Sequence, residues 1–231
     1  LMKLFFRLGL ALGAVSFAVL ASADASAADW PTFRGTSRTG VSADTGLLKS
    51  WPAEGPKLVW KNQGAGRGYA SLTVAGDRIY TLGDGPSTGS EKDEFLICFD
   101  RATGNPVWKS KTGEPWNQGP KDWQSSRSTP TVDGDLVYVV SPHGVLVSCD
   151  AKTGKEAWRK NFKDEFKGNK GDGWGYSESP LIDGDLLICT PGGGTTTMAA
   201  LNKKTGAVVW TVVRPGDRGA GHASAGIANI G

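Results

Sequence analysis

A short phrase that occurs three times constrains the fold of this chain more than any other feature of its sequence. Each copy opens with Asp or Asn, carries Thr-Gly in its middle and closes on tryptophan, and the copies span 100–108, 150–158 and 202–210. The opening side chain can bond the backbone two residues further on, and the glycine supplies a positive φ that other residues resist. The phrase therefore predicts the same hairpin three times, with turn glycines at Gly104, Gly154 and Gly206.

A second phrase precedes each copy at a matching distance. It places Ala-Gly or Asp-Gly between two runs of β-forming residues, with the glycines at Gly76, Gly134 and Gly184. Such a dipeptide between β runs is a strong hairpin signal. Two hairpins per repeat make a four-stranded antiparallel unit of about 50 residues, which is the size and content of one propeller blade.

We expect three such blades. Their strands lie near 70–75, 77–83, 95–100 and 106–110, then 128–132, 135–141, 145–149 and 156–160, then 178–182, 185–190, 197–201 and 207–213. The run 57–61 is interpreted as an outer strand that completes the last blade through Trp60, and Ala223 begins the first strand of a fourth. The predicted fold is an all-β, incomplete β-propeller of four-stranded antiparallel blades.

The number of blades does not close a ring. A propeller typically has about four to eight blades, and an open arc leaves two blade faces and several strand edges bare. We therefore expect the sequence to be the N-terminal part of a longer protein. The alternative, in which two arcs join into one ring, remains open.

The hairpin phrase resembles the repeat A-x-D-x-x-T-G-x-x-x-W of the PQQ-type (quinoprotein-like) β-propellers, most closely at 149–158. The resemblance covers roughly residues 55–231. It implies that Trp108, Trp158 and Trp210 dock adjacent blades, which agrees with their recurrence at one place in each repeat. That family contains quinone-dependent alcohol dehydrogenases, including those acting on polyvinyl alcohol, and scaffolds such as the propeller lipoprotein of the outer-membrane β-barrel assembly machine.

The first residues have the pattern of a secretory signal peptide. Lys3 and Arg7 precede an apolar run over 8–20, and Ala25-Ser-Ala27 offers a small-residue cleavage site. The run is about 13 residues long, which is too short to span a bilayer comfortably. We predict a signal peptide over 1–27, an irregular N-terminal arm over 28–56 and a partial propeller domain over 57–231. The alternative for the leader is an uncleaved membrane anchor.

Export to the periplasm or the outside of the cell follows from that leader, with no transmembrane anchor after cleavage. Cys98 and Cys149 hold places in their repeats that point to opposite faces, so a bridge between them is not expected, and all three cysteines are interpreted as small buried residues. The formal net charge is +3 and the basic residues form no stripe, so no nucleic-acid partner is expected. No His or Cys cluster has zinc spacing and no loop resembles an EF-hand, so no metal is predicted.

Four residues occupy one equivalent place at the start of successive inner strands and differ where their neighbours repeat: Tyr69, Arg127, Ser177 and His222. The loops that enter these strands, 111–127 and 161–177, are rich in tryptophan, tyrosine and polar side chains. Aromatic walls with a few convergent polar groups are typical of small-molecule sites. The sequence therefore predicts a ligand-binding rim formed by Tyr69, Trp123, Arg127, Trp174, Tyr176, Ser177 and His222.

Each rim residue also has a structural interpretation. The tryptophans can cap the core under long loops. Arg127 can brace a loop against Asp122 or Glu178. His222 has no carboxylate partner identified from sequence, and no Ser, His and Asp are placed together by the pattern.

The first functional hypothesis is an exported scaffold that binds a small molecule, a saccharide or a protein at the rim, with no cofactor evident. The alternative is a pyrroloquinoline-quinone-dependent alcohol dehydrogenase, of the polyvinyl-alcohol type, whose catalytic half lies outside this sequence. Pyrroloquinoline quinone and calcium enter only under that alternative, and no catalytic residue is assigned. The chain lacks the adjacent cysteines that many such enzymes carry. A sensor domain fused to a downstream segment is a third possibility.

Overall fold

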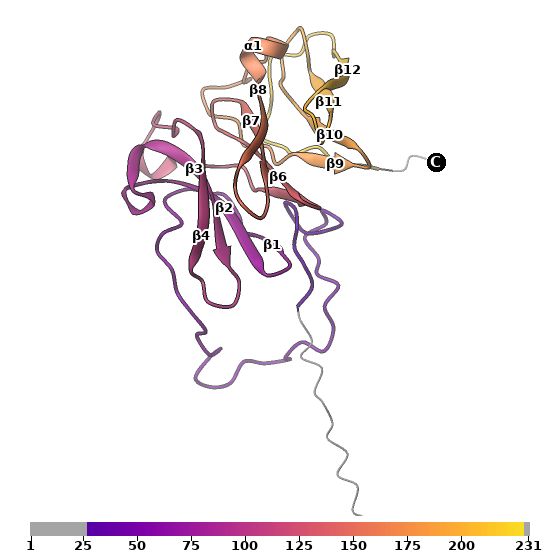
Figure 1. Ribbon diagram of the computed structural model, residues 1–231. Coiled ribbons are helices and arrows are strands. Elements are labelled where there is room, and N and C mark those ends of the chain that lie inside the picture. Colours follow the sequence, from indigo (N-terminus) through magenta and orange to yellow (C-terminus); the bar gives the residue numbers. More distant parts are fainter. Residues whose placement is uncertain (1–26, 229–231) are drawn as a thin grey trace, which may run out of the picture.

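The computed structural model describes residues 27–228, so the predicted signal peptide and its apolar run lie outside the described part. Three four-stranded antiparallel sheets follow one another along the chain, and the strand order within each sheet follows the sequence (Figure 1). The predicted propeller blades are thereby confirmed as sheets.

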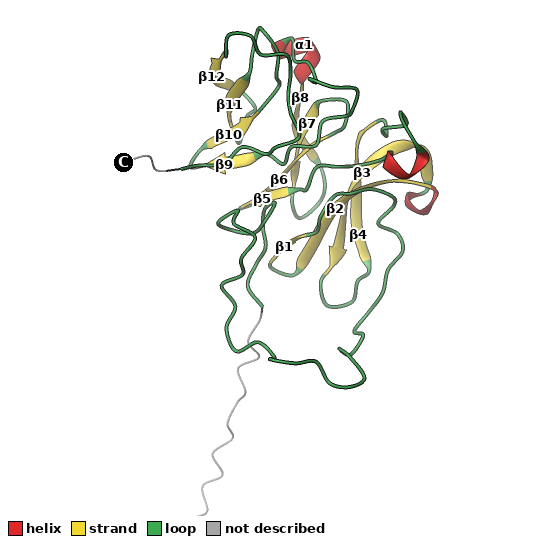
Figure 2. Ribbon diagram, turned by 180° about the vertical axis from the view of Figure 1, so that it is seen from behind, coloured by secondary structure: helices red, strands yellow, loops and turns green. Residues whose placement is uncertain are grey.

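The strands of the first sheet are β1 (Thr73–Ala75), β2 (Arg78–Gly85), β3 (Ser90–Asp100) and β4 (Pro106–Gly113). Those of the second are β5 (Thr131–Asp133), β6 (Leu136–Val140), β7 (Val145–Asp150) and β8 (Glu156–Asn161). Those of the third are β9 (Leu181–Asp183), β10 (Leu186–Cys189), β11 (Met198–Asn202) and β12 (Val208–Val212). Short helices interrupt the loops at η1 (Pro86–Thr88), η2 (Lys121–Trp123) and α1 (Phe162–Phe166), and much of the remaining chain is loop (Figure 2).

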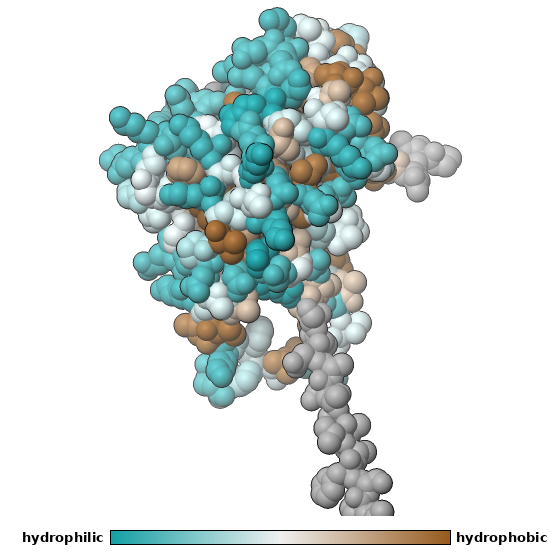
Figure 3. Space-filling model, viewed as in Figure 1, coloured by the Kyte–Doolittle hydropathy of each residue, from teal (hydrophilic) through white to brown (hydrophobic). Residues whose placement is uncertain are grey.

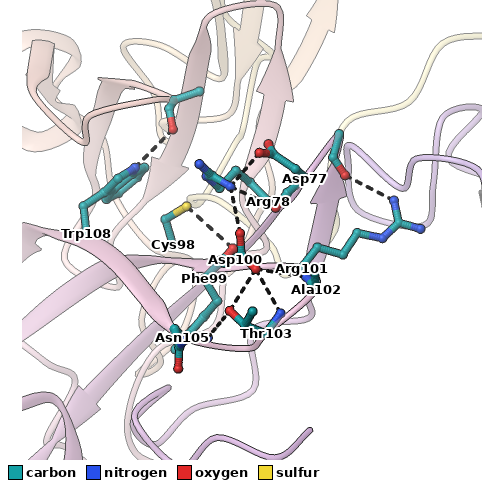
Figure 4. Close-up of polar contacts among 12 residues, drawn as sticks. Asp77, Arg78, Cys98, Phe99, Asp100, Arg101, Ala102, Thr103, Asn105 and Trp108 are labelled. Carbon is teal, nitrogen blue, oxygen red and sulfur yellow. Dashed lines mark hydrogen bonds and ion pairs between the residues drawn. The ribbon is translucent and has the colours of Figure 1, made fainter. Parts of the chain in front are cut away.

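The repeated hairpin forms because its first side chain replaces water on the turn amides. In the first copy, Oδ1 of Asp100 accepts hydrogen bonds from the Ala102 amide at 3.1 Å and from the amide and hydroxyl of Thr103, both at 2.9 Å (Figure 4). Asn202 makes the same three bonds in its copy, and Asp150 accepts from the amide and hydroxyl of Thr153. The three repeat glycines all have φ near +70°, the left-handed region that favours glycine.

The repeat tryptophan joins one blade to the next. The indole of Trp108 lies on the turn of the second sheet, where a Cβ added to Gly154 would be only 2.5 Å from the ring. Its Nε1 donates a hydrogen bond of 3.1 Å to the carbonyl oxygen of Ala151. A residue without a side chain is therefore needed at the turn for two reasons, the positive φ and the indole above it.

Two further tryptophans make the same contact, one at each side of this first pair of sheets. Trp158 donates 3.1 Å to the Lys203 carbonyl and lies over Gly206. Trp60 donates 2.9 Å to the Arg101 carbonyl and lies over Gly104. The predicted strand at 57–61 is wrong, since these residues form no strand, but Trp60 makes the blade contact that a repeat tryptophan makes.

Trp210 differs from the other repeat tryptophans. It is 38% exposed and makes no such turn contact within residues 27–228, so its predicted docking role is not seen there. Its neighbours Val208, Val209, Val212 and Val213 are exposed as well, and an apolar patch lies over β12 (Figure 3). The last sheet therefore presents an uncovered apolar strand.

The core lies between neighbouring sheets. One cluster of buried side chains fills the space between the first and second sheets and contains Leu96, Val137 and Val147. Another fills the space between the second and third and contains Tyr138, Phe162 and Leu201. The three cysteines are buried and unbridged, as expected from the sequence.

The inner strands lie side by side, with β5 between β1 and β9. A ladder of hydroxyls connects their entry segments: the Ser71 amide donates to Thr129 Oγ1 at 3.1 Å, and the Thr129 amide donates to Ser179 Oγ at 2.9 Å. The Ser179 amide continues the ladder to Ser224 Oγ at 2.9 Å. The segment beginning at Ala223 thus lies where a fourth inner strand is predicted, although 221–228 form no strand.

The N-terminal arm crosses these inner strands. Trp30 exchanges backbone hydrogen bonds with Val74 in β1, and the carbonyl of Pro31 accepts from the Val132 amide in β5. The guanidinium of Arg38 then donates to the carbonyls of Ser179 and Pro180 at 3.1 and 3.2 Å. Among residues 27–228, no helix is long and apolar enough to cross a membrane.

Candidate functional site

Side chains from four entry segments meet at one rim of the inner strands. They line a depression of about 340 Å³, and its lining residues are Tyr69, Trp123, Arg127, Trp174 and His222. The structure thus brings together five of the seven residues that the sequence places at the rim. The segments meet because the hydroxyl ladder and a backbone bond from the Tyr69 amide to the Ser126 carbonyl, 2.7 Å long, hold the inner-strand entries side by side.

Arg127 lies among the aromatic rings rather than against a carboxylate. Its guanidinium carbon is 5.4 Å from the ring centre of Trp174 and 6.0 Å from that of Tyr69, within cation–π range. Its Nη2 donates to the Trp123 carbonyl. Partial burial lowers the pKa of Arg127, although the group stays charged at neutral pH. The interpretation that Arg127 pairs with Asp122 or Glu178 is wrong.

The two loop tryptophans form one aromatic wall. Trp123 and Trp174 have ring centres 5.4 Å apart and ring planes tilted by 49°. Trp123 is 55% exposed, so it does not cap the core. Trp116, from the same loop, is the buried one, and it stacks 5.4 Å from His143. The loop therefore places one tryptophan in the core and the other at the rim.

The loop before β5 is held in an unusual backbone conformation. Ser125 has φ of +88° and donates its amide to the Trp116 carbonyl at 2.8 Å. Gln124 donates its side-chain amide to the carbonyls of Asn117 and Gly119. A non-glycine residue in this region costs of order 1–3 kcal/mol, and such residues cluster at functional sites. These bonds fix the approach of the chain to Arg127.

His222 has partners that the sequence did not identify. Its Nε2 lies 2.8 Å from Oδ2 of Asp172, and its Nδ1 lies 3.1 Å from the hydroxyl of Ser177. Asp172 is therefore the carboxylate partner that the sequence left unidentified. Ser177 and His222 occupy equivalent places in adjacent repeats, which was the signal that they lie close together, but nothing in the pattern marked Asp172.

Asp172 remains ionised in this arrangement. Burial opposes its ionisation, but hydrogen bonds from the Trp174 amide and from Nζ of Lys170, together with the nearby positive charges, lower the pKa of Asp172 overall. Lys170 also donates to the Ala220 carbonyl at 3.2 Å, which ties the loop before β9 to the segment that carries His222.

Tyr176 does not belong to the rim. It is only 2% exposed, its ring packs edge-on against Phe162, and its hydroxyl donates 2.8 Å to the Pro191 carbonyl. The prediction that Tyr176 binds ligand is wrong. Neighbouring residues in an extended segment point to opposite sides, so Tyr176 faces the core where Ser177 faces the rim. Ser177, the next residue, is half-buried and contacts His222.

A larger cavity, of about 600 Å³, lies between the turns of the first two sheets and is lined in part by Asp29, Arg78 and Asp150. These side chains hold the N-terminal arm and the hairpin turns through bonds to Gly76, Asp100 and Thr153 respectively. We therefore assign this cavity to turn structure and the smaller, aromatic depression to ligand binding.

Known proteins resemble this chain in its repeats. A family model described as outer membrane protein assembly factor BamB matches residues 21–115 and 92–231. The chain belongs to this family of PQQ-like β-propeller repeat proteins. No curated protein matches this PQQ-like repeat protein.

Solved structures are also similar to this chain. The quinohemoprotein alcohol dehydrogenase from Comamonas testosteroni is similar, with a TM-score of 0.57 and 22% identity over 80% of this chain and 27% of that chain. BamB from Moraxella catarrhalis matches with a TM-score of 0.39 and 22% identity over 60% of this chain and 34% of that chain. The chain spans about a third of that BamB and about a quarter of that dehydrogenase. At its identity, the likeness to the dehydrogenase concerns the fold alone.

The dehydrogenase alternative includes a calcium ion beside the quinone, and that ion requires a set of side chains that bind metal. Within residues 27–228, no group of three or more His, Cys, Asp or Glu side chains is placed to hold a metal ion. Calcium takes about six to eight oxygen ligands, carboxylates prominent among them. The described PQQ-like repeats therefore do not fit calcium, and no dehydrogenase step is derived from them.

Proposed function

We propose that this PQQ-like propeller protein is exported and binds a small molecule or saccharide at the rim lined by Tyr69, Trp123, Arg127, Trp174 and His222. The observation that carries the proposal is their convergence on one depression of about 340 Å³ from loops that neighbouring repeats contribute. Aromatic walls with a few polar groups are the usual lining of ligand sites.

The lining favours a ligand with a flat ring face and a negative charge, such as an acidic sugar. The indoles of Trp123 and Trp174 offer ring surface, and Tyr69 as a residue is 59% exposed. Arg127 supplies a fixed positive charge and a planar fork of donors that matches a carboxylate. No acidic side chain lines the depression.

Titration with glucuronate, monitored by tryptophan fluorescence, tests this proposal, with glucose as the neutral comparison. We expect tighter binding of the anion, and at least a tenfold loss of affinity in Trp123→Ala and in Arg127→Gln, since central aromatic and arginine anchors are worth about 2 kcal/mol or more. Trp51→Ala is the matched control, because Trp51 is 68% exposed on the N-terminal arm. Equal binding by all variants would remove the rim assignment.

The proposed location rests on the signal-peptide pattern of residues 1–27 and on the description of the matching family as an outer membrane assembly factor. Mass spectrometry of the protein from its native host gives the mature N-terminus. We expect it at Ala28. A retained leader would favour the membrane-anchored alternative.

The dehydrogenase alternative has a separate test. The full-length protein is incubated with pyrroloquinoline quinone and calcium, and dye reduction by an alcohol is measured. Quinone uptake with dye reduction would favour that alternative over the binding scaffold. The aromatic depression lined by Tyr69, Trp123, Arg127, Trp174 and His222 supports the binding role.

A further inference from the structure

A serine hydroxyl, a histidine and an aspartate form a chain of hydrogen bonds beside the ligand-binding depression. Ser177 lies at the entry to β9, His222 lies on the following inner segment, and Asp172 belongs to the loop before β9. The hydroxyl of Ser177 is 3.1 Å from His222 Nδ1, and His222 Nε2 is 2.8 Å from Asp172 Oδ2. We propose that Ser177, His222 and Asp172 form a hydrolytic site for carboxylic esters at this rim.

The hydrogen bonds define the roles of the two ring nitrogens. A carboxylate only accepts, so Asp172 fixes the proton of the neutral imidazole on Nε2. Nδ1 is then the unprotonated nitrogen, and its lone pair faces the Ser177 hydroxyl. This is the relation of nucleophile, base and orienting acid that activates serine, and such sites are recognised by geometry rather than by order in the chain.

The surroundings of Asp172 support this role. Lys170 contacts both carboxylate oxygens at 3.3 Å, and the Trp174 amide donates to Oδ1 at 2.9 Å. These bonds keep the carboxylate charged and fixed in orientation, as is needed to stabilise an imidazolium. Lys170 is almost buried, with a side chain 9% exposed, so the arrangement is held by the loop itself.

The depression next to His222 supplies the rest of an ester site. Its walls are the rings of Tyr69, Trp123 and Trp174, which suit an aryl or other apolar part of the ester. Arg127 lines the same depression, and its positive charge is available to the negative carbonyl oxygen of a tetrahedral intermediate.

The reaction balances with water as the second substrate. Ser177 Oγ bonds to the ester carbonyl carbon while its proton passes to His222 Nδ1. The tetrahedral intermediate expels the alcohol, which takes that proton, and leaves an acyl-serine. Water then adds to the acyl carbon and gives a proton to Nδ1, and the proton returns to Ser177 Oγ as the carboxylic acid leaves.

A fluorophosphonate probe tests the proposal on the full chain, because it reacts covalently with activated serine hydroxyls. We expect labelling of the wild type, located at Ser177 by peptide mass spectrometry, and its loss in Ser177→Ala. His222→Gln is expected to slow labelling at least 100-fold, in the range of general-base effects. Ser87→Ala, which removes an exposed hydroxyl in η1, is the control and should label like the wild type.

Hydrolysis of p-nitrophenyl acetate gives a second readout, with an initial burst equal to the labelled fraction. Thermal melting establishes that each variant is folded, and Asp172→Asn provides a further variant if His222→Gln is not. A wild type that neither labels nor shows a burst would overturn the proposal, as would labelling that persists in Ser177→Ala. Because glucuronate binding does not depend on the Ser177 hydroxyl, loss of this activity and loss of the binding role are distinguishable.

Discussion

Replacing Gly154 by alanine tests the reason for the repeated glycine. The new Cβ would lie 2.5 and 2.6 Å from two atoms of the Trp108 ring, which is closer than real Cβ contacts. The indole would have to move, and its bond to the Ala151 carbonyl and part of its packing would be lost. The backbone would also hold a side chain at φ of +73°.

The expected loss in free energy of unfolding has a backbone part and a part due to the displaced indole. The left-handed backbone costs alanine roughly 1–2 kcal/mol. The lost hydrogen bond costs about 1 kcal/mol, and displaced apolar surface adds about 1 kcal/mol for some 40 Å² at 25 cal/mol per Å². Gly154→Ala should therefore lower the free energy of unfolding by about 3–4 kcal/mol.

Gly134→Ala is the matched control, since it lies in the same sheet. Its φ is +56°, and an added Cβ would meet nothing within 4 Å. This variant should show only the backbone part, roughly 1–2 kcal/mol. Urea denaturation of both variants measures the difference, which at a slope of about 2–3 kcal/mol per molar is a midpoint shift of roughly 1 M. Equal midpoints would refute the role of the indole.

Three further outcomes are expected. Trp158→Ala should cost about 2–4 kcal/mol in urea denaturation, whereas Trp210→Ala should cost under about 1 kcal/mol because its ring is exposed; equal costs would contradict the difference in docking. Burial raises the pKa of Glu94 to about 7, so the stabilisation that its neutral carboxyl gives the folded state is fully present below about pH 4 and is lost as the pH rises through 7. Glu94→Gln should abolish this decline in the free energy of unfolding, which is worth at most roughly 3 kcal/mol, and denaturation at a series of pH values measures it. The three buried thiols should not react with Ellman's reagent in the native protein and should all react in urea, and rapid native labelling would disprove their burial.

The blades could be predicted from sequence because the information is local. The bonds from Asp100 reach only two and three residues along the chain, and the positive φ belongs to one glycine. A turn that depends on neighbours in sequence is written in the sequence, and its repetition gives the sheets. Trp60 shows the limit: it was predicted to complete the last blade as part of an outer strand, but that strand does not form, and the indole contacts the turn of the first sheet.

The candidate site could be predicted only in part. Equivalent places in the repeats identified Tyr69, Arg127, Ser177 and His222, because propeller geometry brings equivalent places together. Tyr176 was assigned to the rim only because it lies in the aromatic loop 161–177, although strict alternation from Ser177 would have turned it into the core. Loop residues follow neither period, so their directions are not available from the pattern.

The sequence by itself determined the turns, the strands and the repeated contact of tryptophan on glycine, since each depends on residues at fixed spacing. Only the tertiary structure decided that Asp172 meets His222 and that Arg127 lies between aromatic rings instead of against an acid. The physical reason is that these contacts join separate loops whose paths are set by hydrogen bonds between blades. Such paths are fixed only once the sheets have packed.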